Sequence, residues 1–260
     1  MSKEYQTGIL GVALAVLVAS GMVLNGGCGS KPNDEIRVAV ASNFAETATR
    51  LGETFTRKSG RRVVFSSGST GKHYAQILNG APFDIFLSAD RKHPALLEEM
   101  DIGIRGTRFT YASGRLVLWS EKPDYVDSDG KVLNSSQNLN IAIANPRLAP
   151  YGIAASEVLQ KLGIDAERSG TRIVRGENVG QVFQFVDSGN ADLGFIALSQ
   201  LKARGESGKG SFWVVPQESY TPIEQQAVLI RDSPGAREFL RFLGEPEALE
   251  LIRESGYGTP

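Results

Sequence analysis

Four places in this 260-residue chain put hydroxyl groups or free backbone donors at the predicted start of a helix. They are Ser42-Asn43, Ser69-Thr70, Pro150-Tyr151-Gly152 and Asn178-Val179. The first residues of a helix carry unpaired backbone N–H groups and a partial positive charge, so they bind anions without lysine or arginine. Several such starts directed at one cleft predict a cage of neutral donors for a small oxyanion.

The residues needed for other chemistry are scarce. The only histidines are His73 and His93, neither lies in an H-E-x-x-H pattern, and the single Cys28 cannot build a thiolate metal site. Asp84 and Asp90 bracket a predicted strand, where caps or turn contacts are expected rather than a catalytic carboxylate pair. The sequence therefore predicts no metal ligands and no cofactor.

Two motifs compete with the oxyanion interpretation. Gly71-Lys72 is similar to part of a phosphate-binding loop, but Ser66 replaces its first glycine and His73 replaces its final hydroxyl residue. Ser69 and Lys72 match the S-x-x-K of serine acyl enzymes, although no accompanying S-D-N, K-T-G or G-x-S-x-G motif occurs. A serine acyl enzyme using Ser69 and Lys72 stays as an alternative of a different class.

Composition limits the possible partners. The chain has 41% hydrophobic and 22% charged residues, as expected of a soluble globular protein, and a formal net charge of −1. Its charges of both signs are interspersed, which argues against nucleic-acid binding through a basic face.

The N-terminus resembles an export signal. An apolar run over 9–24 follows Lys3 and is too short for a comfortable membrane span. Cys28 then follows small residues, as in a bacterial lipoprotein processing site, although Asn25 replaces the usual leucine. We expect residues 1–27 to be a signal peptide, 28–35 a polar tether and Cys28 a lipidation site in the periplasm or on the outer face of the cytoplasmic membrane. An ordinary signal peptide or an uncleaved anchor is the alternative.

The rest of the chain alternates between β- and α-type patterns. Strands are expected over 36–41, 62–66, 84–88, 115–120, 139–144, 172–174, 193–197 and 223–230. Helices are expected over 43–59, 69–78, 90–100, 151–162, 178–188, 234–243 and 246–255. Asn43-x-x-Glu46 and Asn178-x-x-Gln181 resemble capping boxes. This alternation predicts an α/β protein with parallel or mixed sheets covered by helices.

Two runs of this alternation predict two lobes. Lobe 1 would comprise 36–117 and 225–260, and lobe 2 would comprise 118–224. Two crossing strands, near 115–120 and 223–230, would form the hinge. Ligands of open α/β sheets bind beyond the carboxyl ends of the strands, so the predicted ligand cleft lies between the lobes.

Specific sequence strings carry a family resemblance that covers 36–260. They are Ala-Ser-Asn-Phe at 41–44, Ser-Gly-Ser-Thr-Gly-Lys at 67–72, Gly-Ala-Pro-Phe-Asp-Ile-Phe-Leu-Ser-Ala-Asp at 80–90, Asn-Pro at 145–146 with Ala-Pro-Tyr-Gly at 149–152, and Ala-Asp-Leu-Gly-Phe at 191–195. In this order they resemble the molybdate-binding proteins of ABC transporters.

The resemblance implies a two-lobed, type II-like periplasmic binding protein that is not an enzyme. Its cleft would hold molybdate or tungstate, and the monomer would deliver the ion to a membrane permease. The implied donors are the Ser42, Thr70 and Tyr151 hydroxyls and the backbone N–H groups of Asn43 and Val179, with Ser69 as a possible addition. One branch of the family uses a tyrosine hydroxyl where this chain has Ala197. The chain therefore resembles the other branch, with Tyr151 in compensation.

The expected donors suit one class of ligand. Molybdate, tungstate and sulfate are tetrahedral dianions, whereas monohydrogen phosphate keeps a proton that needs an acceptor. An unpaired polar group costs about 1–3 kcal/mol, so a cage of donors alone disfavours phosphate. A receptor for sulfate or another tetrahedral oxyanion stays as an alternative. Lys72 and Arg175 lie near the donors in the sequence, and we expect them to be solvated or to support the site from outside.

Overall fold

The computed structural model describes residues 35–135, 138–164, 170–205 and 210–260. The predicted signal peptide, Cys28 and all of the predicted tether except Glu35 lie outside the described residues. Within these described ranges, no helix is long and apolar enough to cross a membrane.

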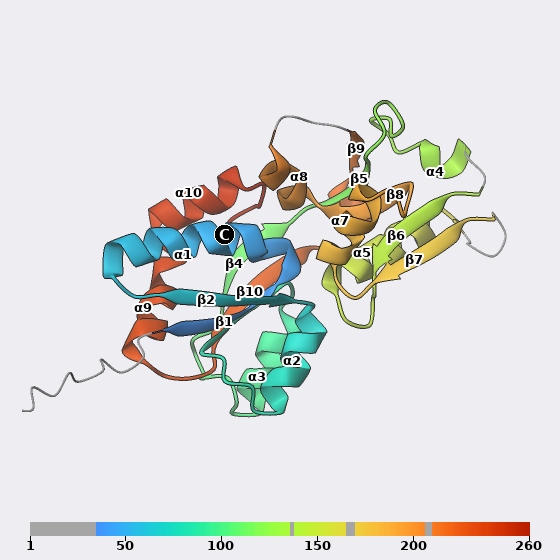
Figure 1. Ribbon diagram of the computed structural model, residues 1–260. Helices are drawn as coiled ribbons and strands as arrows, with labels where there is room; N and C mark the ends of the chain where they lie inside the picture. The colour runs from blue at the N-terminus through green and yellow to red at the C-terminus, as the bar shows by residue number, and fades with distance from the viewer. Residues whose placement is uncertain (1–34, 136–137, 165–169, 206–209) are drawn as a thin grey trace, which may run out of the picture. The chain divides into compact units, whose positions relative to one another are not determined.

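The first sheet has five strands of mixed direction (Figure 1). In spatial order they are β2 (Val63–Gly68), β1 (Ile36–Ala41), β3 (Ile85–Ser88), β10 (Ile223–Leu229) and β4 (Phe109–Gly114). Strand β1 is parallel to β2 and β3, whereas β10 is antiparallel to β3 and β4.

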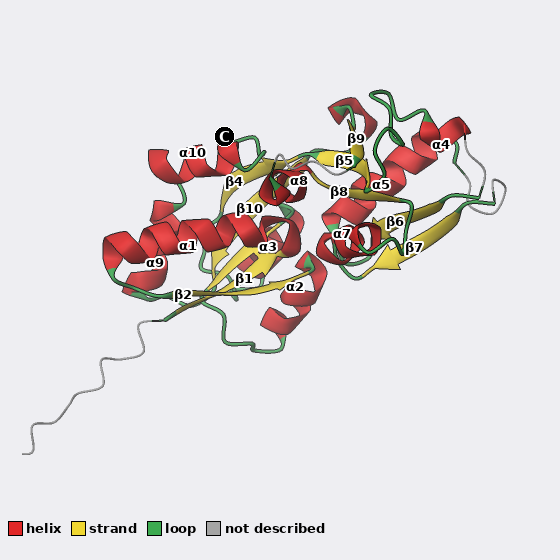
Figure 2. Cartoon of the chain, turned by 45° about the horizontal axis from the view of Figure 1, so that its top comes forward, coloured by secondary structure: helices red, strands yellow, loops and turns green. Residues whose placement is uncertain are grey.

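The second sheet repeats this plan with its own strands (Figure 2). Their order is β7 (Arg172–Gly176), β6 (Asn140–Ala144), β8 (Leu193–Ala197), β5 (Leu116–Ser120) and β9 (Ser211–Val214). Strand β6 is parallel to β7 and β8, and β5 is antiparallel to β8 and β9. Two mixed five-stranded sheets confirm the predicted α/β class.

Helices cover both sheets. Those of the first sheet are α1 (Ala45–Ser59), preceded by the 3₁₀ turn η1 (Ser42–Phe44), α2 (Thr70–Leu78), α3 (Lys92–Glu99), α9 (Pro234–Phe242) and α10 (Pro246–Glu254). Those that follow strands of the second sheet are α4 (Val132–Ser135), α5 (Pro150–Lys161), α7 (Val179–Asp187) and α8 (Leu198–Arg204), with the 3₁₀ turn η2 (Gln217–Ser219) before β10.

Strand periodicity decides which helices pack on which face of the first sheet. Val38 and Val40 belong to one cluster with side chains of α1, α9 and α10, whereas Ala39 between them packs with Ile77 of α2 and Leu97 of α3. Successive strand residues point to opposite faces, so both faces of β1 are buried. Figure 1 shows the same division, with α1 and α10 on one side of the sheet and α2 and α3 on the other.

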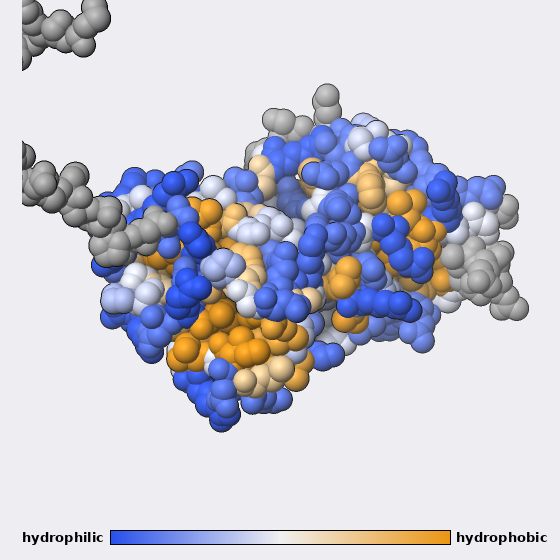
Figure 3. All heavy atoms as spheres, turned by 60° about the horizontal axis from the view of Figure 1, so that its bottom comes forward, coloured by the Kyte–Doolittle hydropathy of each residue, from blue (hydrophilic) through white to orange (hydrophobic). Residues whose placement is uncertain are grey.

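On the face that Figure 3 shows, the surface of the described residues is mostly polar, with apolar residues gathered in patches. The large apolar side chains that are exposed are Leu78, Met100, Ile153, Leu162, Phe212 and Val214. The main apolar clusters are buried against the sheets.

Most predicted elements occur within a few residues of their expected bounds, but β4, β9, α4 and α8 were not predicted. Strand β4 reads Phe-Thr-Tyr-Ala-Ser-Gly and lacks an apolar run. It forms because β10 pairs with it over Ile223–Ala227. Strand formation there depends on a partner far away in the sequence, which a local pattern does not reveal.

One predicted helix cap is wrong and one is present. The chain enters α1 through η1, and Asn43 makes no side-chain cap because its amide donates to Gln225 and Tyr257. Asn178 does cap α7, since its side chain accepts from the backbone N–H of Gln181 at 3.1 Å. The Gln181 side chain returns to the N–H of Glu177 at 2.7 Å, which completes a variant of the predicted box.

The chain passes between the two sheets twice. It leaves the first sheet at Arg115, between β4 and β5, and returns between β9 and β10. Both passages lie in or beside the predicted crossing segments. The division into lobes at 117/118 and 224/225 stays a prediction, because residues 34–260 form one compact unit.

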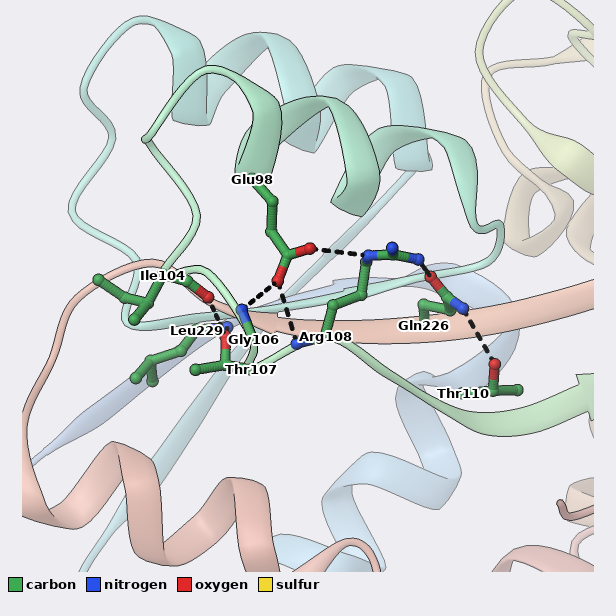
Figure 4. Close-up of polar contacts among 8 residues, drawn as sticks. All are labelled: Glu98, Ile104, Gly106, Thr107, Arg108, Thr110, Gln226 and Leu229. Carbon is green, nitrogen blue, oxygen red and sulfur yellow. Dashed lines mark hydrogen bonds and ion pairs between the residues drawn. The ribbon is translucent and has the colours of Figure 1, made fainter.

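A polar network fixes the start of β4 (Figure 4). Glu98 of α3 accepts from the backbone N–H of Gly106 at 3.0 Å and pairs with the Arg108 guanidinium at 3.0 Å. Arg108 also donates to the Gln226 side chain at 2.7 Å, and Gln226 donates to Thr110 at 3.0 Å. This network joins α3, β4 and β10 through side chains.

Candidate functional site

The predicted donors meet at one small cavity of about 10 Å³. Its walls are formed by Ala41, Ser42, Asn43, Gly68, Ser69, Thr70, Ala89, Ala149, Pro150, Tyr151, Asn178 and Val179. These residues lie at or just beyond the ends of β1, β2, β3 and β6 and at the start of α7. The structure therefore brings together every position proposed from the sequence as an oxyanion donor, including Ser69.

Ser42 presents a hydroxyl whose oxygen is already engaged. Its Oγ accepts a hydrogen bond from the backbone N–H of Gly180 at 3.2 Å, near the start of α7. A hydroxyl has one proton to donate and can still do so after accepting a bond. The proton of Ser42 is thus available to an acceptor in the cavity that this residue lines.

Thr70 has the same arrangement at the start of α2. Its side chain is buried, and its Oγ1 accepts from the backbone N–H of Ala89 at 3.1 Å. Since Ala89 also lines the cavity, this bond holds the hydroxyl at the wall. The backbone N–H fills an acceptor position of the oxygen and leaves the proton free.

Ser69 and Tyr151 have buried hydroxyls with no hydrogen-bond partner among the described residues. Burial is the main reason that the pKa of Tyr151 lies well above its ordinary value, and the nearby Tyr257, Tyr220 and Tyr111 act in the same direction. The Asn43 side chain opposes this shift, but no hydrogen bond of good geometry joins it to the Tyr151 hydroxyl. Tyr151 therefore keeps its proton at neutral pH and is a donor.

Two backbone groups complete the wall. Val179 is the first residue of α7, and Asn43 lies in the 3₁₀ turn that begins directly after β1. The N–H groups at the first positions of a helix have no acceptor within that helix. Both residues are buried and line the cavity.

Charged side chains stay outside the cavity. Lys72 is half exposed and forms an ion pair with Glu177 at 3.0 Å, and Arg175 is exposed. The Lys72 ion pair joins α2 to the turn before α7. The backbone N–H of Gly71, also in α2, donates to the Leu148 carbonyl oxygen at 2.8 Å and joins α2 to the turn before α5. The cavity is thus closed by contacts between elements of the two sheets while its walls carry no formal charge.

Several residues next to the site had no recognisable signal in the sequence. The Asn43 carbonyl oxygen accepts from Ser199 at 3.0 Å and from Tyr257 at 2.6 Å. Gln225 accepts from the Asn43 amide at 2.9 Å, and Gly114 lies against the Tyr151 hydroxyl. These residues come from α8, the C-terminus and the strands at the sheet crossing, so only the fold places them here.

The two carboxylates and the rival motif have structural roles. Asp84 accepts from the backbone N–H of Arg37 at 2.7 Å, and Asp90 accepts from the N–H of His93 at 3.0 Å. Among the described residues, no group of histidine, cysteine, aspartate and glutamate side chains could hold a metal ion. Lys72 bonds to Glu177 rather than to Ser69, so the pair that an acyl enzyme needs is not formed.

A much larger cavity lies elsewhere in the described part of the chain and is not the candidate site. It measures about 960 Å³ and lies between the residues around the start of β4 and helix α9, with Phe109, Arg237 and Leu240 in its walls. It shares no residue with the small cavity. The small cavity is identified by its converging unpaired hydroxyls rather than by its volume.

Comparisons with known proteins show the family to which the chain belongs. A family model described as bacterial extracellular solute-binding protein matches residues 36–258. The chain is 46% identical over 227 residues to the molybdate-binding protein ModA of Azotobacter vinelandii, covering 86% of this chain and 90% of that protein. It is 44% identical over 250 residues to ModA of Rhodobacter capsulatus, covering 95% of each.

A solved structure extends the likeness to three dimensions. The periplasmic molybdate-binding protein of Azotobacter vinelandii superposes with a TM-score of 0.82 at 43% identity, over 86% of this chain and 99% of that chain. The predicted fold class is therefore that of a solved periplasmic binding protein.

His73 gives a testable pH dependence beside the site. It is buried, and burial lowers its pKa below the ordinary value of 6.5. Between the folded and unfolded pKa values the unfolded chain binds more protons, so stability rises with pH and is lost as pH falls below about 6.5. One proton corresponds to at most about 1.4 kcal/mol per pH unit.

We expect the free energy of unfolding, measured by urea denaturation from pH 7.5 to 5.5, to decrease with acidification. His73→Asn should flatten this dependence, because asparagine does not titrate. Equal slopes for the two proteins would contradict the role of His73.

Proposed function

Because the chain belongs to the family of bacterial extracellular solute-binding proteins, we propose that it captures molybdate or tungstate outside the cytoplasm and delivers it to an ABC transporter. The relatives are transport proteins that bind molybdate by name. On this proposal the protein is a binding protein rather than an enzyme, and the oxyanion is its cargo rather than a cofactor.

The convergence of unpaired buried hydroxyls on one cavity carries this proposal. Ser69 and Tyr151 have no partner among the described residues, and Ser42 and Thr70 have their oxygens occupied by backbone N–H groups. All four hydroxyls therefore offer protons to whatever occupies the cavity. A tetrahedral dianion, which has four oxygen acceptors and no proton, matches this set.

Each candidate residue receives one role. The hydroxyls of Ser42, Thr70 and Tyr151 and the backbone N–H groups of Asn43 and Val179 donate to the oxyanion, and Ser69 adds a further hydroxyl. A charge-assisted hydrogen bond contributes about 1.5–3 kcal/mol. Five or six of them, less the cost of ordering the site, are enough for sub-micromolar affinity.

Neutral donors also set the selectivity. Burying lysine or arginine costs desolvation energy that offsets its attraction for the anion, whereas hydroxyl and N–H groups avoid that cost. Monohydrogen phosphate would place its own proton among donors and leave it unpaired. Sulfate is smaller than molybdate, so rejection of sulfate depends on donors that are too far apart to contact all of its oxygens at once.

The alternatives have less support. A serine acyl enzyme would need Lys72 beside Ser69, but Lys72 pairs with Glu177. A sulfate receptor would share the donor chemistry, yet the similar proteins over most of the chain carry molybdate in their names. We therefore favour molybdate or tungstate.

We further propose how the protein is placed and how it works. An N-terminal signal peptide directs export, and a lipid on Cys28 anchors the chain through the tether of residues 28–35. The monomer closes its two lobes, 36–117 with 225–260 and 118–224, around the ion and presents it to the membrane permease. The extracellular family and the lipoprotein-like sequence around Cys28 support this placement.

Ligand binding tests the function directly. Isothermal titration calorimetry should show one molybdate or tungstate bound per chain at sub-micromolar affinity. A ligand at 100 times its dissociation constant stabilises the fold by about 2.7 kcal/mol, so the melting temperature should also rise. Sulfate and phosphate should have little effect at the same concentration. A larger shift with sulfate than with molybdate would instead support the sulfate receptor.

Paired substitutions test whether neutral donors hold the anion. Thr70→Ala should weaken molybdate binding by about 1.5–3 kcal/mol, because it removes one charge-assisted bond, and Thr70→Ser should restore most of the affinity. Lys72→Ala should change the binding energy by no more than about 1 kcal/mol, since it breaks only a solvent-exposed ion pair. Calorimetry that ranks Lys72→Ala as the more damaging change would refute the neutral cage.

The lipid anchor is tested on the mature protein. Mass spectrometry of the membrane-associated chain should find Cys28 as the N-terminal residue, with an acylated mass. Cys28→Ser should release the protein from the membrane while molybdate affinity is unchanged, because the site lies entirely within residues 41–179. A mature N-terminus elsewhere, or an unmodified Cys28, would exclude the anchor.

A further inference from the structure

Gln225 is a buried polar residue next to the proposed site that has no assigned role. It lies in β10, is fully buried and does not line the cavity. The pairing of β10 with β4 shifts register between Gln225 and Gln226, so that Gln225 lies opposite Ala112 and Gln226 opposite Thr110. Such a bulge redirects side chains, and here Tyr111 is the extra residue.

The orientation of the Gln225 amide is set by two donors. Its Oε1 accepts from the Asn43 Nδ2 at 2.9 Å, and the Tyr111 hydroxyl at 3.2 Å shares its single proton between this oxygen and the Ser88 carbonyl oxygen at 3.1 Å. The amide is planar, so its Nε2 must point away from both donors. A side-chain amide nitrogen donates and does not accept. Gln225 thus presents a donor in a fixed direction.

That donor lies beside the same glycine as the Tyr151 hydroxyl. A Cβ atom added at Gly114 would lie 3.0 Å from the Gln225 Nε2 and would overlap the Tyr151 hydroxyl oxygen. The two polar atoms therefore lie against the same face of Gly114, where no side chain separates them. Both are buried, and neither has a hydrogen-bond partner among the described residues. Two unpaired polar atoms so close together need a common explanation.

We propose that Gln225 is a positioning residue for the Tyr151 hydroxyl: when the oxyanion binds, the Gln225 Nε2 donates to Oη, so that the phenolic proton is directed to the anion. This inference rests on the proposed function. A hydroxyl that accepts from a donor-only group cannot lose its own proton to that group. The backbone N–H groups of Gly180 and Ala89 act in this way on Ser42 and Thr70. Gln225 extends the same arrangement to the tyrosine.

Gly114 lies next to both the Gln225 amide and the Tyr151 hydroxyl. It lies at the end of β4, directly before the chain crosses to the second sheet. Any larger residue would put at least a methyl group between the Gln225 amide and the Tyr151 oxygen. The absence of a side chain at this position lets the two polar groups approach each other.

A double-mutant cycle measured by calorimetry with molybdate tests the proposal. Tyr151→Phe should weaken binding by about 10- to 100-fold, equivalent to one charge-assisted bond. Gln225→Met should weaken binding by about 3- to 10-fold in the unaltered chain, and by less than about twofold in the Tyr151→Phe background. The hydroxyl that Gln225 positions is gone there, so only the small effect of losing its contact with the Asn43 amide should remain.

Gln225→Met is expected to fold. The Asn43 amide keeps Tyr257 as an acceptor at 3.1 Å, and the Tyr111 hydroxyl keeps the Ser88 carbonyl oxygen at 3.1 Å. The matched control is Gln226→Met, in the next residue of the same strand. Its amide belongs to the Arg108 and Thr110 network (Figure 4). This control should retain the molybdate affinity of the unaltered chain.

Gly114→Ala is an independent second variant, since it leaves both contacts of the Gln225 oxygen in place. It should weaken molybdate binding in the presence of Tyr151 and have little further effect in the Tyr151→Phe background. The positioning role alone would be overturned if Gln225→Met weakened molybdate binding by the same factor in both backgrounds. Unchanged molybdate affinity of the Gln225→Met single variant would overturn it as well. If the unaltered chain does not bind molybdate, the proposed function and this inference both fail.

Discussion

The candidate site presents hydroxyl protons that have no acceptor among the described residues. The hydroxyl oxygens of Ser42 and Thr70 each accept a hydrogen bond from a backbone N–H group, and each hydroxyl proton stays available to donate. Ser69 and Tyr151 are buried without any partner among the described residues. A buried polar group left unpaired costs about 1–3 kcal/mol. An oxyanion that accepted from these groups would recover this free energy, and the described residues that line the cavity carry no formal charge.

The fold assembles these donors because strands of both sheets end near the same place. Parallel strands have their carboxyl ends on one edge, and the helices that follow present free N–H groups there. Strands β1 and β2 lead to Ser42 and Ser69 in the first sheet, and β6 leads to Tyr151 in the second. The contact from Gly180 to Ser42 then joins the two groups. Two crossings of the chain are enough to connect the sheets on either side of the cavity.

Local sequence predicted the elements that depend on local chemistry, and the family resemblance supplied the candidate donors. The starts of α2, α5 and α7 occur within a residue of the expected positions, and all six proposed donor residues line the cavity. The failures share a cause. Asn43 was expected to cap α1, but Gln225 and Tyr257 take its amide, and strand β4 forms only because β10 pairs with it. Neighbours 182 or 214 residues away along the chain leave no local pattern.

The polar groups behind the cavity explain why its donors can be uncharged and still be well oriented. The Asn43 carbonyl oxygen is held by Ser199 and Tyr257, and its amide is held by Gln225 and Tyr257. Burial raises the pKa of Tyr111 and Tyr257, so both stay protonated and act as donors in this network. Side chains fixed in this way lose little entropy when a ligand binds. Charge would attract the anion from a longer distance, but a rigid arrangement of neutral donors discriminates between anions by the positions of their oxygens and by whether they carry a proton.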